Sequence, residues 1–296
     1  MGKKWGIGVG LVGLVLSGGY LRFIGEGKTE GVVAGEFKEE AAMSLMPTGT
    51  PTLSPTPLPT ATPSVVPTKE AQAVQEPCAK VPVLTYHHVQ DMAEAGAQGH
   101  AGLTVSPEYF RKQMEYLRDR GYSVISMQTL VNFFDGGVAL PPKPVLVTFD
   151  DGYDNFATHA YPILSQLGFA ATVFLPTGLM NNPGYLSWEA IDSMAGGGKI
   201  LFANHTWSHK SVQSNPGVEK KEIGTADGQL AERGLNSPRV FAYPYGKAAE
   251  YAKEYLASLG YKLAFTTYSG SKLCAGQRLA LPRVRVGNAS LSAYGF

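Results

Sequence analysis

The chain has 296 residues, of which 44% are hydrophobic, and 25 Lys and Arg are balanced by 24 Asp and Glu. This length and apolar content allow one large or two small domains with a substantial core. The near-neutral balance gives no support to a broad basic surface, so we expect no nucleic-acid partner. Cys78 and Cys274 are too few for a disulfide scaffold. They either pair in an oxidising compartment or remain two free thiols.

The beginning of the chain has the order of an export signal. Lys3 and Lys4 precede an apolar run over residues 5–24, which is long enough to span a bilayer. We therefore expect residues 1–28 to be a cleaved signal peptide or an uncleaved membrane anchor. Either one places the protein outside the cell or tethered to its surface. A buried cytoplasmic helix is disfavoured, because the segment that follows could not pack against it.

Residues 29–76 are expected to be a linker. From residue 46 to residue 68 the sequence is almost entirely proline, threonine, serine and small apolar residues. Such a composition prefers extended conformations and cannot bury enough surface to fold. We predict a disordered Pro/Thr-rich segment, acting as a stalk or as a plain connection, followed by one globular domain over residues 77–296.

Short strands alternate with helices in this domain. Residues 81–86 predict a strand that leads into His87 and His88, whose side chains must point in opposite directions if the strand continues. Ser106 and Ser126 are predicted to cap two helices. Further strands are predicted near residues 124–125, 145–149, 170–175, 200–203, 240–242, 263–266 and 281–286, and further helices near 156–167, 187–195, parts of 216–234, and 247–259.

This alternation implies right-handed crossovers and a parallel sheet. The number of units suggests closure into a barrel. The pattern of residues alone does not distinguish a barrel from an open doubly wound sheet.

Two acidic residues follow the strand over residues 145–149. Asp150 and Asp151 repel each other and lose hydration near a core, which indicates a compensating cation, proton or substrate. His205 and His209 follow another predicted strand. Because the carboxyl ends of parallel strands meet at one mouth of a barrel, we expect all four side chains to converge there. One carboxylate and two imidazoles suit a divalent ion such as zinc, and the other carboxylate is then free to act as a base.

The sequence resembles the polysaccharide deacetylases that carry the NodB-homology domain, carbohydrate esterase family four. The resemblance covers roughly residues 80–290, and it rests on Thr148-Phe149-Asp150-Asp151, His205-Thr206-Trp207-Ser208-His209 and Phe241-Ala242-Tyr243-Pro244-Tyr245-Gly246. It implies an α/β fold, the distorted (β/α)7 barrel of that family. It also implies a metal-dependent hydrolase that holds a divalent ion, zinc first and cobalt or nickel as alternatives.

The resemblance assigns roles to individual residues. Asp151, His205 and His209 are implied as the metal ligands, and Asp150 as the general base that acts on the attacking water. The backbone amide of Tyr245 is implied to contribute to an oxyanion hole.

Four residues are candidate sugar contacts. Pro244 and Tyr245 are included because they form the third motif, and Trp188 and Trp207 because indole rings can stack on sugars. Packing in the core is the alternative for the two tryptophans.

Two departures from the family pattern are informative. Ala242 stands where many members carry an arginine, and the C-terminal leucine-x-histidine motif has no counterpart. Both features are similar to the exported poly-β-1,6-N-acetylglucosamine deacetylases, in which the acid histidine comes from an early strand. The resemblance favours His87 over His88 as the acid. Arg283 is the candidate for the missing arginine, with Arg285 as the alternative.

The implied activity is removal of N-acetyl groups from a cell-surface polysaccharide, poly-β-1,6-N-acetyl-D-glucosamine in the first place. Peptidoglycan, chitin oligomers and acetyl-xylan are alternative substrates. A catalytically inactive carbohydrate-binding module and a wall-anchored structural protein are alternatives from other classes. We expect a monomer whose partners are the polysaccharide and, through the N-terminal segment, a membrane.

Several other polar residues are interpreted as structural. Tyr153 and Asn155 are read as turn residues beside the two acids. His100 and His159 are read as surface or packing residues. The charge run over residues 219–222 predicts a solvated helix face.

Overall fold

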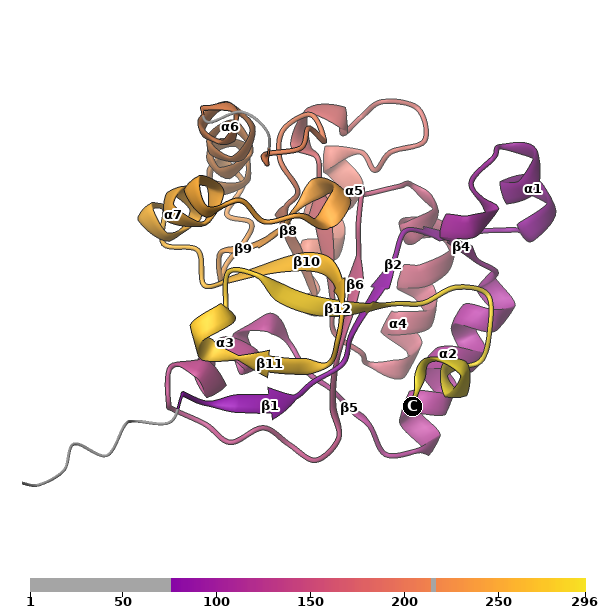
Figure 1. Ribbon diagram of the computed structural model, residues 1–296. Helices are drawn as coiled ribbons and strands as arrows, with labels where there is room; N and C mark the ends of the chain where they lie inside the picture. Colours follow the sequence, from indigo (N-terminus) through magenta and orange to yellow (C-terminus); the bar gives the residue numbers. More distant parts are fainter. Residues whose placement is uncertain (1–75, 214–216) are drawn as a thin grey trace, which may run out of the picture. The chain divides into compact units, whose positions relative to one another are not determined.

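The computed structural model describes residues 76–213 and 217–296 (Figure 1). The expected signal or anchor over residues 1–28, and all of the expected linker except Glu76, lie outside the described residues. Across the two described ranges, no helix combines the length and the apolar character needed to cross a membrane.

Seven parallel strands close into a barrel, as predicted. The backbone pairs from Val83–Leu146 to Tyr86–Phe149 join the first strand of the barrel to the second in chain order. These two strands stand at opposite ends of the order given below, so their pairing closes the sheet and excludes an open one. Around the barrel the strands follow the order β2 (Val83–Tyr86), β12 (Leu281–Arg285), β10 (Leu263–Ser269), β9 (Val240–Ala242), β8 (Ile200–Asn204), β7 (Ala171–Leu175) and β6 (Pro144–Phe149).

The barrel is irregular at two places. The register shifts between β10 and β12, and β8 meets β9 at a single pair, Asn204 with Phe241. A short additional strand, β5 (Ser123–Val124), pairs with the beginning of β6. These departures from regular pairing agree with the expected distorted (β/α)7 barrel.

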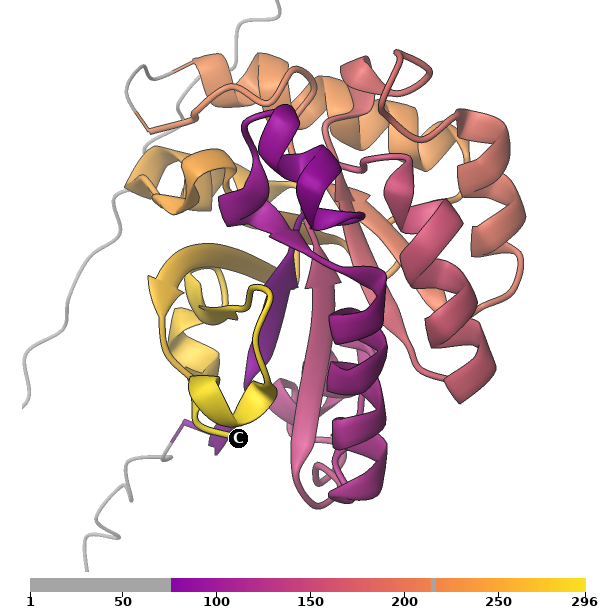
Figure 2. The ribbon, with the colours of Figure 1, turned by 90° about the vertical axis from the view of Figure 1, so that its right-hand side faces the viewer.

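Helices surround the strands (Figures 1 and 2). The side chains of Ser106 and Ser126 accept hydrogen bonds from the amides of Tyr109 and Thr129, so both predicted N-caps are confirmed. The helices are α1 (Met92–Ala97), α2 (Pro107–Asp119), α3 (Met127–Phe134), α4 (Tyr161–Leu167), α5 (Trp188–Ala195), α6 (Val218–Glu232) and α7 (Glu250–Ser258).

The single helix predicted over residues 156–167 is wrong in detail. A wide π turn over Phe156–Ala160 precedes α4, and the amide of Tyr161 bonds the carbonyl of Phe156, five residues back. The next residue is Pro162, which has no N–H for an α-helical bond, so the regular ladder cannot start earlier. The helix ends at Gly168, whose φ of 68° suits a left-handed C-cap.

The strands separate an inner core from an outer core. On β7, Phe174 packs in the inner cluster with Leu146 and Phe265, which belong to other strands of the barrel. Its neighbours Val173 and Leu175 pack in the outer cluster, under α2, α4 and α5. Because alternate residues of a strand face opposite sides, this division fixes which residues near the strand ends face the barrel axis.

Between β2 and α2 the chain leaves the barrel. Strands β3 (His88–Val89) and β4 (Thr104–Val105) pair in parallel, and α1 lies between them in sequence. Figure 1 shows this excursion as an outlying lobe beside the barrel. The sequence did not predict either of these strands, each of which has only two residues.

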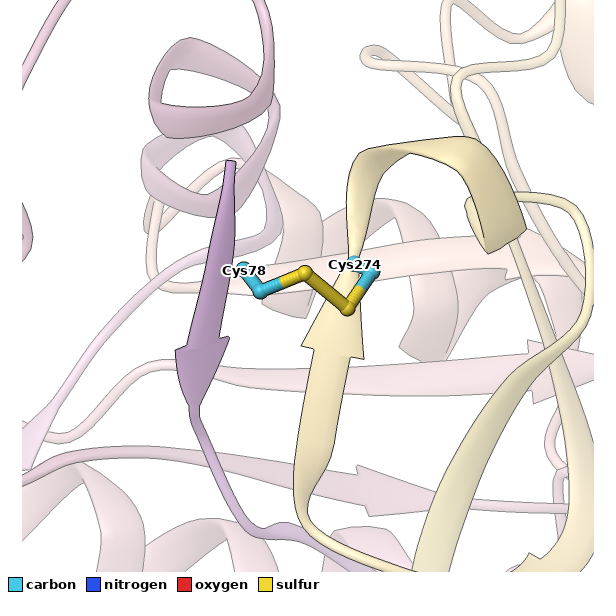
Figure 3. Close-up of a disulfide and its surroundings, with 2 residues drawn as sticks. All are labelled: Cys78 and Cys274. Atoms are coloured by element: carbon cyan, nitrogen blue, oxygen red, sulfur yellow. A yellow bond between two sulfur atoms is a disulfide. The ribbon is translucent and has the colours of Figure 1, made fainter. Parts of the chain in front are cut away.

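The two cysteines pair with each other. Cys78 lies on β1 (Cys78–Lys80) and Cys274 on β11 (Lys272–Cys274), two antiparallel strands in which the cysteines stand opposite each other (Figure 3). This resolves the alternatives that the sequence left open. The bridge closes a loop with a sequence separation of 196 residues.

Replacing both Cys78 and Cys274 with serine is expected to lower the free energy of unfolding by about 2–5 kcal/mol, because the bridge removes entropy from the unfolded chain. Urea unfolding with and without a reductant measures the effect. Reductant should destabilise the wild-type protein and leave the double variant unchanged. Equal stability of the two proteins without reductant would contradict the prediction.

Candidate active site

The inner face of the strands leads into one cavity at their carboxyl ends. On β6, Leu146 belongs to the inner core, so Thr148 and then Asp150 continue on the same side. On β2, Val83 belongs to the inner core, so His87 follows on that side. The cavity has a volume of about 550 Å³ and is lined by Thr85, His87, Leu103, Asp150, Asp151, Tyr153, His205, His209, Tyr243, Tyr245, Thr267, Arg283 and Arg285.

Asp151, His205 and His209 form a compact cluster in this cavity. The Nε2 atoms of His205 and His209 lie 3.3 Å and 3.1 Å from Oδ1 of Asp151. One candidate ligand atom from each residue lies within 4.8 Å of the others. The structure therefore brings together the three side chains that the sequence analysis named as ligands.

The donor set fits a divalent cation. The Nδ1 atom of His205 lies 2.8 Å from the carbonyl oxygen of Ala242, which can only accept, so Nδ1 carries the proton. In the neutral ring Nε2 is then a lone-pair donor facing a carboxylate oxygen, and Oδ1 of Asp151 is buried without a hydrogen-bond partner. Burial raises the pKa of Asp151, but the two imidazoles beside it outweigh burial and hold the pKa well below its usual value. An ionised oxygen beside imidazole nitrogens is a suitable ligand set for a metal such as zinc.

The backbone is strained around this cluster. Asp151, Thr206, His209 and Tyr245 have φ values of 72°, 72°, 58° and 60°. These values lie in the left-handed region, which non-glycine residues rarely adopt. Strain of this kind persists where the surrounding structure imposes it, and it concentrates at functional sites.

Asp150 is held by a buried arginine. The Nη1 and Nη2 atoms of Arg283 donate to the two carboxylate oxygens at 2.8 Å and 2.7 Å, and Nε donates to the carbonyl of Thr266. Asp150 and Arg283 are 3% and 2% exposed, so the pair is almost completely removed from water. Burial raises the pKa of Asp150, but the charge and hydrogen bonds of Arg283 outweigh burial and hold the pKa below its usual value.

Arg285, the alternative partner, lines the cavity but does not reach Asp150. Its Nη2 donates to the carbonyl of Gly102, and the side chain is exposed. The two arginines share a strand face and differ in depth, with Arg283 deeper in the barrel. This difference makes Arg285 a matched control for Arg283.

Replacing Arg283 with methionine is expected to lower the free energy of unfolding by about 3–5 kcal/mol near pH 7, because the charge of Asp150 stays buried without its partner. Wild-type Asp150, with its lowered pKa, contributes stability that is lost as the pH falls below its unfolded pKa. Without Arg283, burial raises the pKa of Asp150 in the folded variant above its unfolded value. Protonation of the buried carboxylate then removes its uncompensated charge as the pH falls, and the variant loses less stability.

The stability gap between wild type and Arg283→Met should therefore narrow from about pH 7 to about pH 4.5. Urea unfolding at both pH values measures the gap. Arg285→Met, the control, should cost less than about 1 kcal/mol at either pH, as for an exposed side chain. A gap that is constant with pH would contradict the assignment of the ion pair.

His87 and His88 diverge as predicted. His87 lines the cavity beside the two acids, whereas His88 faces away from it toward His100. Burial lowers the pKa of His87, and the carboxylates of Asp150 and Asp151 oppose that effect. The structure thus places His87, and not His88, where a proton could be exchanged in the cavity.

Tyr245 lies at the rim of the cavity in the short turn Pro244–Gly246. The residue is 66% exposed, and its ring lies 5.0 Å, centroid to centroid, from the ring of His209. Gly246 has a φ of 78°, and a Cβ there would clash with the side chain of Thr267. Pro244 is buried and does not line the cavity.

The two tryptophans do not line the cavity. Trp188 begins α5 and packs against the outer core, with the guanidinium of Arg233 4.3 Å from its ring centroid. Trp207 lies against Gly178, where a Cβ would meet its indole at 2.5 Å, and under the ammonium of Lys221. These contacts support packing for both residues, and their choice as sugar contacts stays a prediction.

The charge run over residues 219–222 is only half solvated. Its two lysines are exposed, but Glu219 and Glu222 are buried. Glu222 accepts hydrogen bonds from the backbone N–H and the hydroxyl of Ser208, both at 2.8 Å, and so anchors the segment between His205 and His209. The predicted solvated face is wrong for the glutamates, which share a helix face with the buried Ile223.

Two residues interpreted as turn residues have larger roles. Tyr153 lines the cavity, and burial together with the nearby charge of Asp151 raises its pKa. Asn155 is buried, and its amide nitrogen lies 2.9 Å from Nδ1 of His88. Their position directly after the two acids was the available signal. No sequence pattern identified the partner of Asn155.

Comparisons with known proteins identify similar sequences and folds. The model of the family described as "Polysaccharide deacetylase" matches residues 137–264. The poly-beta-1,6-N-acetyl-D-glucosamine N-deacetylase of Escherichia coli K12 is 29% identical over 249 residues, which cover 69% of this chain and 36% of that protein. The alignment thus spans about a third of the length of that relative.

Two solved structures are similar in fold. The deacetylase PplD of Streptococcus pyogenes, in complex with acetate, is 29% identical with a TM-score of 0.66, over 72% of this chain and 96% of that chain. A polysaccharide deacetylase from Bacillus cereus is 27% identical with a TM-score of 0.64, over 74% of this chain and 68% of that chain.

Proposed function

The chain belongs to the polysaccharide deacetylase family, and from that premise we propose that it removes N-acetyl groups from poly-β-1,6-N-acetyl-D-glucosamine with the help of a divalent metal ion, zinc in the first place. The observation that carries the proposal is the convergence of Asp150, Asp151, His87, His205 and His209 on one cavity. A base, an acid and a set of metal ligands at one point are what amide hydrolysis requires.

Asp151, His205 and His209 would hold the ion. When bound, a divalent ion supplies positive charge that polarises a carbonyl and lowers the pKa of water. The protein contributes fixed orientation. The backbone carbonyl of Ala242 orients His205, and Glu222 anchors the segment that carries His209.

Asp150 would take a proton from the water that attacks the acetyl carbonyl. Arg283 holds the carboxylate in one orientation. It also keeps the pKa of Asp150 low, so the carboxylate is ionised near neutral pH and can accept a proton. The backbone N–H of Tyr245 would donate to the oxygen that becomes negative.

His87 would give a proton to the departing amine nitrogen. Burial lowers its pKa, which makes its protonated form a stronger acid, and the neighbouring carboxylates limit this lowering. One water is added across the amide bond, so the acetyl group leaves as acetate and the sugar keeps a free amine.

The choice of β-1,6-linked polymer has two supports. The Escherichia coli relative carries that substrate in its name. In addition, Ala242 stands where many family members have an arginine, and Arg283 supplies a guanidinium to Asp150 from another strand. Deacetylation of peptidoglycan, chitin oligomers or acetyl-xylan is the alternative. We also propose that the protein acts outside the cell or at its surface, as a monomer.

The test uses the full chain with defined β-1,6-linked and β-1,4-linked N-acetylglucosamine oligomers and measures released acetate, with and without a chelator. We expect chelator-sensitive release from the β-1,6 series. Release from the β-1,4 series alone would redirect the assignment to chitin-like or peptidoglycan substrates. Binding of oligomers without any release, with every divalent metal tried, would favour a carbohydrate-binding module instead.

A further inference from the structure

A second cavity adjoins the catalytic cavity and is not used by the chemistry proposed above. Its volume is about 490 Å³, within the range of about 300–1,000 Å³ that is common for ligand sites. Tyr153 and Leu103 line both cavities, so the two are neighbours. The second cavity lies between the lobe that contains α1 and the segment after β6 and β7.

Stacked rings build one wall of this cavity. The ring of His88 lies between those of His100 and Tyr153, with centroid distances of 4.1 Å and 3.7 Å and interplanar angles of 10° and 19°. Tyr185 continues the row at 5.4 Å from Tyr153. Because both faces of His88 are covered, a ligand can meet this ring only at its edge.

Hydrogen bonds assign the proton of His88. The backbone N–H of Val89 donates to Oδ1 of Asn155 at 3.1 Å, which fixes the orientation of the amide. The amide nitrogen of Asn155 then faces Nδ1 of His88 at 2.9 Å and must donate to it. Nδ1 is therefore an acceptor, and the ring carries its proton on Nε2.

The same network assigns the proton of His100. Asn155 also donates to Oε1 of Gln90 at 2.8 Å, so the amide nitrogen of Gln90 is the atom that faces Nε2 of His100 at 2.9 Å. That nitrogen also donates to Oε1 of Gln98. Nε2 of His100 is thus an acceptor, and its proton lies on Nδ1.

Both imidazoles are accordingly neutral. Burial, first, and then the nearby His100 and His87 lower the pKa of His88 to about 4. Within residues 76–213 and 217–296, neither the Nε2–H of His88 nor the Nδ1–H of His100 has a protein acceptor. Two oriented N–H donors remain for a ligand.

Acceptors line the same cavity. The carboxylates of Glu94 and Asp154 belong to its wall, and both residues are exposed. A hydroxyl group can both accept from an N–H group and donate to a carboxylate, so a ligand that carries several hydroxyl groups suits this wall. Sugars combine these hydroxyls with apolar C–H edges that pack against aromatic rings.

We propose that the second cavity binds a sugar unit of the polysaccharide next to the unit that is deacetylated, through hydrogen bonds from His88 and His100. This inference rests on the proposed function. It predicts that lengthening the substrate raises kcat/KM, because only a longer chain occupies both cavities.

The test compares kcat/KM for acetate release from β-1,6-linked dimers and tetramers, using the full chain. The ratio of tetramer to dimer is the readout. His100→Phe keeps a ring in the stack and removes its N–H, so the ratio should fall about three- to tenfold, as for a lost hydrogen bond. Thr158→Trp fills the cavity from an exposed position of its wall, without touching the histidine network, and should lower the ratio similarly.

Thr158→Ala is the matched control and should keep the wild-type ratio. If the wild-type ratio is close to one, or if all four proteins share one ratio, the second cavity is not a sugar site. If no protein releases acetate from any oligomer, the proposed function itself has failed, and the two failures are thereby distinguished.

Discussion

Replacing Asp150 with asparagine is expected to lower kcat for acetate release by about 10²–10⁴-fold, the usual contribution of a general base, and to leave the metal content unchanged. The asparagine has nearly the same shape but cannot accept a proton from water. Asp151, His205 and His209 are untouched, so the proposed ligand set persists. Acetate release and metal content per chain, measured on the same preparation, check both parts.

The surface pair of Asp192 with Arg233 supplies a control for this variant. Its N–O distance of 2.8 Å resembles that of Asp150 with Arg283, but its side chains are 48% and 36% exposed. Asp192→Asn should therefore keep kcat within about twofold, because an exposed pair contributes less than about 1 kcal/mol to stability. Turnover that survives Asp150→Asn, or metal that is lost with it, would show that the roles of the two adjacent acids are interchanged.

The centre of the site was predictable because its signals are local. Each of Asp150 and His205 follows an apolar strand directly, and parallel strands of a barrel bring their carboxyl ends together. The divergence of His87 and His88 followed from strand alternation alone. In these cases the residues next to each side chain in the sequence predict its position at a strand end, and closure of the barrel brings those strand ends together.

The parts that the sequence left open or missed depend on partners far away in the chain. Arg283 was the named candidate and Arg285 the alternative, because Asp150 is 133 residues away from Arg283 and only depth in the barrel separates the two arginines. Trp207 was named as a sugar contact because indole rings can stack on sugars, but its indole packs against Gly178 on another segment. No local pattern reports such a contact.

The burial of Glu222 was also missed, although the sequence contained a pattern that predicts it. It lies one residue before Ile223 and four before Ala226, and all three are buried. Helical spacing thus placed it on the buried face, although the charge run suggested solvent. A buried glutamate needs hydrogen-bond donors, and Ser208 supplies two of them beside the site. A charged residue at a position where the helical pattern predicts an apolar one therefore indicated a buried hydrogen-bond network near the site.

Replacing His209 with alanine is expected to abolish both metal retention and turnover, in contrast to Asp150→Asn. Removal of one of the three proposed ligands should weaken metal binding by at least about 100-fold, since even the partners that orient ligands contribute 10–100-fold. The fold should survive, because the side chain of His209 is 25% exposed whereas that of His205 is 2% exposed and part of the packed barrel mouth.

Metal content after dialysis against a weak chelator, together with acetate release at saturating added zinc, checks the expectation for His209→Ala. His159→Ala, which removes an exposed histidine outside the catalytic cavity, is the control for metal content and should retain the wild-type amount. Should His209→Ala keep its metal while losing turnover, His209 would be a proton-transfer group and the ligand set would need another member. His209 would then act on the substrate directly, because its ring lies at the rim of the cavity, 5.0 Å from the ring of the exposed Tyr245.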